Sequence, residues 1–245
     1  MKSTETRNES MIEKKVEEMV YEKVIQPFEG REYGYVGAEL EYLILPADNE
    51  TPLADMGSDF LHYLVEQHGF EVSGIGSDGR YMRVTKEGDD VSFDYSYLLL
   101  EFSMAKQRSL MTIWEHFLPM FRTARDYYEE RGCKIGCFGR NPFHTHRGEY
   151  TQDAFYSMIR KYLMDYSQDK DLNKYFTNMA SVQTHIDVPM EHLLKTYNLF
   201  NELDFVGALL FSNSGKLEDP ESEICCMRDE YWEKCGIPDI GVYAH

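Results

Sequence analysis

Net positive charge and long apolar runs are both missing from this sequence. Its 245 residues include 43 Asp and Glu against 25 Lys and Arg, a formal net charge of -18. Nucleic-acid-binding surfaces depend on clustered basic residues, and anionic lipid would repel so acidic a chain. The longest apolar run, residues 205–211, is far shorter than the about 20 residues that cross a bilayer. We therefore expect neither a nucleic-acid nor a membrane partner.

Cysteine is scarce, and linker-like segments are absent. The five cysteines stand at positions 133, 137, 225, 226 and 235. An odd number, without an apolar signal segment at the N-terminus, is typical of reduced thiols in a cytoplasmic protein. Cys133 and Cys137 have no second pair at zinc-site spacing. Because there is no repeat or low-complexity tract and 42% of residues are apolar, we expect residues 1–245 to form one domain.

Apolar residues at helical spacing predict five helices. These cover residues 10–25, 58–68, 109–132, 152–166 and 189–200. Ser10 and Ser58 are the predicted N-caps of the first two helices, and the third should begin near Ser109. Gly69 should end the second helix, and Pro119 should kink or split the third. The apolar stripe of each helix is expected to face a core.

Segments of period two lie between these helices and predict strands with one apolar and one polar face. In residues 35–45, Glu39 and Glu41 share the polar face. In residues 95–103, Glu101 lies opposite the apolar residues. In residues 181–188, Gln183, His185 and Asp187 form the polar row, and Val182, Ile186 and Val188 should point inward. Residues 81–85 and 91–95, joined by KEGDD, predict a hairpin.

This order of elements predicts an α+β fold. We expect a curved, mostly antiparallel sheet with helices covering its apolar face. The polar face would then form one wall of a cleft.

The polar residues of the three strands suit a divalent cation. Carboxylates and imidazole are suitable ligands for Mg²⁺ or Mn²⁺, and such a metal would let an acidic protein bind ATP by neutralising both parties. The competing interpretation is a sheet whose polar face is simply solvated. Lys, Thr and Arg would be expected on such a face, whereas all three strands carry ligand-type residues.

Other motifs are weak. FSNSGK lacks the earlier glycine of a P-loop, and residues 74–79 lack the strand–helix frame of a dinucleotide-binding turn. His144 and His146 could be metal ligands, although a loop of exposed histidines explains them better.

Several segments resemble, in the same order, motifs of the glutamate-cysteine ligases of plants and many bacteria. This family belongs to the glutamine synthetase-like carboxylate-amine ligases. The segments are GAELEYLIL from residue 37, LLLEFSMAKQRSL from residue 98, SVQTHID from residue 181, LLFSNS from residue 209 and CMRDEYW from residue 226. Together they extend over most of the chain.

The resemblance implies an ATP-dependent ligase with a glutamine synthetase-like catalytic fold. Such an enzyme phosphorylates the γ-carboxylate of glutamate and then forms an amide with an amine such as cysteine, as in glutathione biosynthesis. Its cofactor would be Mg²⁺ or Mn²⁺. The implied roles are metal ligation by Glu39, Glu41, Glu101 and His185, nucleotide or substrate contact by Gln183, catalysis and substrate binding by Arg228, and substrate binding by Trp232.

The sequence departs from the family pattern at two places. Family members carry Arg-Tyr before the helix at 155–166, where this chain has Ala154, Phe155 and Tyr156. The family also continues well beyond its Arg-x-x-x-Trp motif, whereas this sequence stops at His245, so the site is expected to be incomplete.

Several alternatives stay open. One is a degenerate or truncated homologue that binds metal, nucleotide or amino acid without ligation. Another is a ligase whose site is completed by a partner or a second copy, because apolar helix stripes can serve an interface as well as a core. The last is a non-enzymatic interaction protein.

Overall fold

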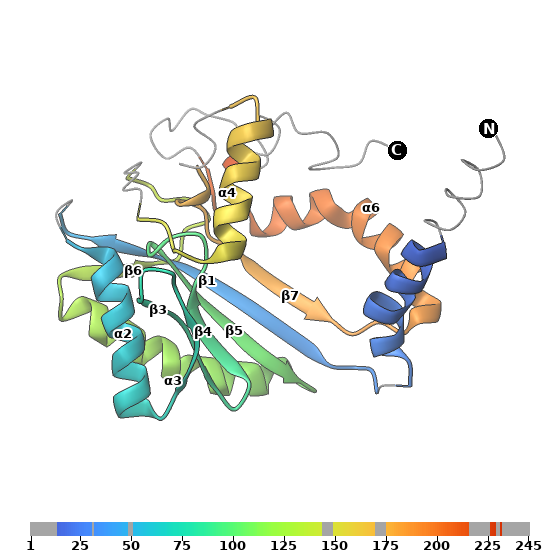
Figure 1. The fold of residues 1–245 in the computed structure, drawn as a ribbon, viewed down its shortest axis with the longest axis horizontal. Coiled ribbons are helices and arrows are strands. Elements are labelled where there is room, and N and C mark those ends of the chain that lie inside the picture. Colours follow the sequence, from blue (N-terminus) through green and yellow to red (C-terminus); the bar gives the residue numbers. More distant parts are fainter. Residues whose placement is uncertain are drawn as a thin grey trace.

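A computed structural model describes residues 14–30, 32–48, 51–143, 149–169, 175–215, 226–228 and 231. The fold is α+β and contains one seven-stranded sheet (Figure 1). The strands are β1 (Val36–Pro46), β2 (Glu71–Ile75), β3 (Tyr81–Lys86), β4 (Asp89–Phe93), β5 (Leu99–Gln107), β6 (Cys133–Gly136) and β7 (Val182–Ile186). The strand order is β2-β3-β4-β5-β1-β6, and β7 pairs with β1 beside β6. All of these pairs are antiparallel, so the predicted fold class is confirmed.

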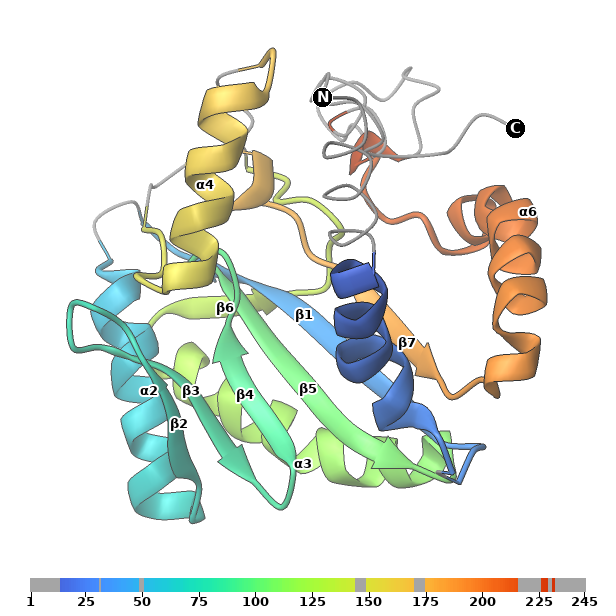
Figure 2. The same ribbon diagram turned by 45° about the vertical axis from the view of Figure 1, so that its right-hand side comes forward.

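Helices α2 and α3 lie together on one face of the sheet (Figure 2). The α-helices are α2 (Leu53–His68), α3 (Leu110–Glu129), α4 (Ala154–Tyr166) and α6 (Leu193–Phe211). Residues 14–20 form a further α-helix, which continues as a π-helix over Tyr21–Ile25 and a 3-10 turn over Gln26–Phe28. A second 3-10 turn, Met190–His192, precedes α6. Among the described residues, no helix has the length and apolar character needed to cross a membrane.

The main core lies between the sheet and helices α2 and α3. Alternate residues of β1 and β5 point into it, as their period-two pattern predicts. Its members include Ala38, Ile44, Leu100, Phe102, Ile113 and Phe117. Tyr42 stacks on Phe117 with ring centroids 6.0 Å apart, which ties the centre of β1 to α3.

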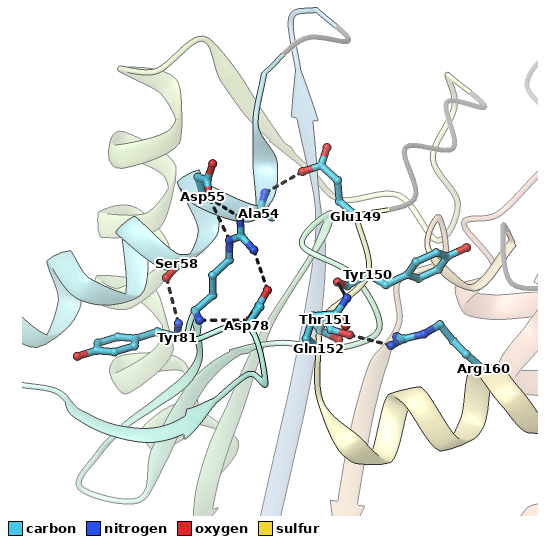
Figure 3. Close-up of polar contacts among 11 residues, drawn as sticks. Ala54, Asp55, Ser58, Asp78, Tyr81, Glu149, Tyr150, Thr151, Gln152 and Arg160 are labelled. Carbon is cyan, nitrogen blue, oxygen red and sulfur yellow. Dashed lines mark hydrogen bonds and ion pairs between the residues drawn. The ribbon is translucent and has the colours of Figure 1, made fainter.

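Helix α2 begins at Leu53, so the predicted start at Ser58 is wrong. The Glu149 carboxylate accepts a hydrogen bond from the Ala54 backbone N–H at 2.8 Å, as Figure 3 shows. A residue far away in the sequence therefore satisfies a donor that a local cap would otherwise take. Ser58 instead accepts a bond from the Tyr81 N–H at 3.0 Å. The predicted end is confirmed, because Gly69 adopts a left-handed conformation with φ of 70°.

Helix α3 begins as predicted. The Ser109 side chain accepts a hydrogen bond from the Met111 N–H. The helix runs unbroken through Pro119, so the predicted split does not occur. Its apolar face packs across β5, β6 and β1, and this burial holds the helix together despite the backbone hydrogen bond that proline cannot make.

Strands β2 and β6 were not predicted from the sequence, and β5 begins four residues later than predicted. Glycine interrupts β2, which contains Gly74, and β6 is only four residues long. Residues 94–98 form a turn that reverses the chain between β4 and β5. The predicted hairpin is confirmed as β3 and β4.

The apolar residues of β7 are exposed, so their predicted burial is wrong. Val182 is 69% exposed and Ile186 54%. They pair with Leu40 and Val36 of β1 and therefore belong to the helix-covered face, but α2 and α3 lie over β1, β3, β5 and β6. The apolar stripe of α4 is also exposed at Phe155, where the sequence predicted a core. Ser10, the predicted first cap, lies outside the described residues.

Candidate functional site

The face of the sheet opposite α2 and α3 carries the predicted carboxylates. Glu41 of β1 pairs directly with Glu101 of β5, and Glu39 pairs with Ser103. Cross-strand partners of an antiparallel pair have side chains on the same face, about 5 Å apart at Cβ. The three glutamates are therefore neighbours.

Strand β7 brings an imidazole and an amide to the same place. Gln183 pairs with Glu39, and His185 pairs with Gly37. The His185 Nε2 atom lies 3.2 Å from the Glu39 Oε1 atom. The Gln183 amide donates a hydrogen bond to the Glu41 Oε1 atom at 3.3 Å. A Cβ atom at Gly37 would lie 3.4 Å from the His185 Cβ atom, in ordinary van der Waals contact, so β7 lies close to β1 at His185.

Arg228 reaches this face from the C-terminal segment. Its guanidinium donates a hydrogen bond to the Ala180 carbonyl oxygen at 3.0 Å. Ala180 directly precedes Ser181, which binds Glu41. Its positive charge acts on the Glu41 carboxylate. The structure thus brings together six predicted residues, namely Glu39, Glu41, Glu101, Gln183, His185 and Arg228. Trp232, His144 and His146 lie outside the described residues.

Glu41 is held in place by Ser181. Its Oε2 atom accepts hydrogen bonds from the Ser181 backbone N–H at 2.8 Å and from the Ser181 hydroxyl at 3.0 Å. Burial raises the pKa of Glu41 above its ordinary value, and the bonds from Ser181 partly oppose this. The charge of Glu101 raises the pKa further, and that of Arg228 lowers it. Hydrogen bonds from Ser181 and Gln183 therefore orient this carboxylate, while charges on two other segments shift its pKa.

Glu101 is buried, and neighbouring carboxylates repel its negative charge as they do that of Glu41. Desolvation raises the pKa of its carboxyl group, a hydrogen bond from the Ser103 hydroxyl opposes that effect, and the charge of Glu39 adds to it. Arg83 supplies a positive charge that lowers the pKa.

Asp94 is a member of this group that the sequence reasoning missed. Burial, followed by the charges of Glu101, Glu41 and Glu39, raises the pKa of Asp94 to about 8. The sequence contained a signal for it. Ser92 pairs with Glu101 on the polar face, and Asp94 follows two residues later, which is the period of a strand. We call Glu39, Glu41, Asp94 and Glu101 the acidic face.

The acidic face has a buried end and an open end. Glu101 is 9% exposed. At the other end the Glu39 side chain is 31% exposed and the His185 side chain 56%. A cavity of about 390 Å³ adjoins this open end, and Lys106, Ser103 and Tyr35 contribute to its wall. A ligand could approach the carboxylates from the side of β7.

The chemistry of the acidic face fits a divalent cation. Carboxylates and an imidazole are ligands of Mg²⁺ and Mn²⁺, and a cation would relieve the repulsion that raises the pKa values of Asp94, Glu41 and Glu101. Within the described part of the chain, however, no three His, Cys, Asp or Glu side chains already surround one point as metal ligands would. Glu41 and Glu101 are instead engaged by the two serines, so binding a metal requires side-chain movement.

Neither a protein-family model nor a curated protein matches this chain. The contacts of the acidic face are therefore the basis for assigning a function.

Proposed function

We propose that the chain is an ATP-dependent carboxylate-amine ligase of the glutamate-cysteine ligase type, built on a glutamine synthetase-like sheet. One observation supports the proposal. The residues that the resemblance identifies lie far apart in the sequence, from Glu39 to Arg228, yet they are neighbours on one face of the sheet. Solvation alone gives no reason for three glutamates, a histidine and an arginine to gather in this way.

In the proposed reaction, an oxygen of the glutamate γ-carboxylate attacks the γ-phosphorus of ATP, and ADP leaves with the electron pair of the broken P–O bond. The nitrogen of the amine then attacks the acyl carbon, loses a proton and expels phosphate. The product is an amide, with ADP and phosphate released. When bound, Mg²⁺ or Mn²⁺ would neutralise the negative charge of the phosphates.

The roles of the protein residues follow from their positions. Glu39 and His185, at the open end, would bind a metal that enters with the nucleotide. Glu41 and Glu101 provide negative charge deeper in the face. Arg228 presents a planar guanidinium that can bind a carboxylate or a phosphoryl group through two parallel hydrogen bonds. Lys106, on the cavity wall, favours an anionic ligand next to the metal.

The reaction can be tested by measuring phosphate release from Mg-ATP. We expect release that requires both glutamate and an amine, with cysteine as the first amine to try, and a γ-glutamyl amide detectable by mass spectrometry. The Arg228→Gln variant should lose most of kcat, because it keeps a polar side chain but removes the guanidinium group and its charge. Arg125→Gln is the matched control, since Arg125 pairs with Asp126 on the exposed side of α3.

The absence of amine-dependent release from the wild-type protein would refute ligation. Equal rates for Arg228→Gln and Arg125→Gln would refute the role of Arg228.

A second candidate function is binding of metal and nucleotide without ligation. The exposure of His185 at an edge strand favours it, because a site open to water on one side hydrolyses an acyl phosphate readily. Mg-ATP binding without an amide product would distinguish this candidate from the ligase.

A further inference from the structure

Helix α6 has an unusual surface. None of its residues is buried, although ten of them are large and apolar, and these ten are between 45% and 81% exposed. Apolar residues occupy all sides of the helix rather than one stripe. A helix that is apolar all round is normally buried on all sides. The charged residues of α6 are only Lys195, Glu202 and Asp204.

Strand β7 presents a second feature at the same side of the molecule. Within the described residues β7 pairs with β1 alone, so its other edge carries no strand. Every residue of β7 is exposed, and Val182 and Ile186 add apolar surface. In Figures 1 and 2, α6 lies beyond β7 on the side away from β1. An open strand edge with apolar neighbours is a template for another strand.

The size of this surface decides what kind of partner it fits. Ten side chains of this exposure, six of them leucine, present on the order of 1,000 Å² of apolar area, given roughly 150–250 Å² for an aromatic side chain and somewhat less for leucine. A typical monomer exposes a patch of roughly 300–600 Å², whereas one partner of a stable protein complex buries about 800 Å². The surface is therefore large enough for one side of a stable dimer, and it exceeds the patch that a typical monomer exposes.

The charge of the chain helps to identify the partner. A net charge of -18 opposes binding to anionic membranes. The surface of α6 and β7 itself carries few charges, so two copies can meet there with little repulsion. A two-fold axis joins a patch to itself, and an antiparallel strand edge and an apolar helix are both self-complementary in this way.

We propose that α6 and the free edge of β7 form the interface of a homodimer. The second copy covers the apolar residues of α6 and extends the sheet beyond β7. Because His185 lies on β7, this interface borders the open end of the acidic face. The proposal does not depend on the ligase activity.

Sedimentation velocity at micromolar protein concentration tests the dimer. We expect the wild-type protein to sediment at twice its mass of 28.7 kDa. Phe205→Asp and Leu209→Asp should each raise the dimer dissociation constant at least about 30-fold, the loss typical of a hot-spot residue. Val182→Glu, on β7, should do the same. Ile75→Asp is the control, because Ile75 is an exposed apolar residue of β2, the strand at the far end of the sheet order from β1 and β7, and should leave the dimer unchanged.

Circular dichroism establishes that each variant is folded, and because Phe205, Leu209 and Val182 are all exposed, at least one folded variant is expected. A wild-type monomer at micromolar concentration overturns the proposal. So does a wild-type dimer that the substitutions on α6 and β7 leave intact, a complex with a different protein, or binding to vesicles of anionic lipid instead of dimerisation.

Discussion

At the scale of single residues, the acidic face concentrates negative charge that the neighbouring arginines and hydrogen-bond donors only partly offset. The pKa values of Glu41, Glu101 and Asp94 are all raised, in each case chiefly by desolvation and further by neighbouring carboxylates. Such groups destabilise the fold once they ionise. Proteins keep unfavourable arrangements of this kind at functional sites more often than elsewhere, which is why the acidic face is the best candidate site.

Asp94 should make stability depend on pH. Folding raises its pKa from the ordinary value of 3.8 to about 8, so the folded state holds the proton more tightly. The free energy of unfolding therefore falls as pH rises through this interval. Asp94→Asn should remove this contribution and be more stable than wild type at pH 8 by about 2 kcal/mol, less than the full shift because nearby acids share the repulsion.

Urea denaturation from pH 4 to pH 8 measures this difference. Asp126→Asn is the control, because Asp126 is exposed on α3. Parallel pH profiles for the wild type and Asp94→Asn would show that ionisation of Asp94 does not destabilise the folded protein.

Mg²⁺ should stabilise the folded protein by relieving the same repulsion. At a concentration about 10 times its dissociation constant, a ligand that binds only the folded state adds about 1.4 kcal/mol. Glu41→Gln should keep the hydrogen bonds from Ser181 but lose most of the Mg²⁺ response. Glu66→Gln, at an exposed position of α2, should respond like the wild type. Thermal unfolding with and without Mg²⁺ tests this, and an equal rise in Tm for all three proteins would count against a cation site.

At the scale of helices and strands, local sequence predicted the elements that have local causes. The start of α3 near Ser109, the Gly69 end of α2 and the alternation of β1 depend on residues close in sequence, and all three are present. The start of α2 was missed because Glu149, far along the chain, binds the Ala54 N–H. Likewise, Val182 is exposed because α2 and α3 pack on other strands of the sheet. The sequence of β7 alone does not contain that information.

The close packing of α2 against the turn before β5 should make the stability of the protein sensitive to substitution of Gly57. A Cβ atom at this position would lie 2.8 Å from the Tyr97 ring and 2.9 Å from the Phe93 ring. Gly57→Ala should therefore cost about 2 kcal/mol of unfolding free energy, because overpacking outweighs the higher helix propensity of alanine. Gly207→Ala in α6, where nothing lies within 4 Å of the added atom, should instead stabilise by about 0.8 kcal/mol.

Urea denaturation at low protein concentration compares the two variants. A Gly57→Ala protein as stable as the wild type would mean that α2 packs less tightly than described.

At the scale of the whole molecule, the two sides of the sheet have different tasks. One side is filled by α2, α3 and a continuous apolar core. The other carries the acidic face, open toward β7. The net charge of -18 first served to exclude nucleic acid. Part of that charge is gathered into one acidic cluster, and the proposed metal-nucleotide site depends on this concentration rather than on the total.

The site itself was predictable in part. The alternation of β1 and β5 placed Glu39, Glu41 and Glu101 on one face, and the pairing of β7 with β1 brings His185 to Glu39. Asp94 was missed because it lies where the chain turns from β4 to β5, just after the last paired residues of β4. The contact of Arg228 with the Ala180 carbonyl depends on a long-range return of the chain that motif order alone does not predict.

The most direct test of the central claim is a calorimetric titration of Mg-ATP into the wild-type protein and into Glu101→Gln. Glu101→Gln keeps the shape of a buried side chain and removes one charge of the acidic face, whereas Glu66→Gln removes an exposed charge and serves as the control. We predict saturable heat for the wild type and for Glu66→Gln, and binding at least about 10-fold weaker for Glu101→Gln, as expected for the loss of one charged ligand. No heat with the wild type, or equal binding by all three proteins, would contradict a metal-nucleotide site on the acidic face.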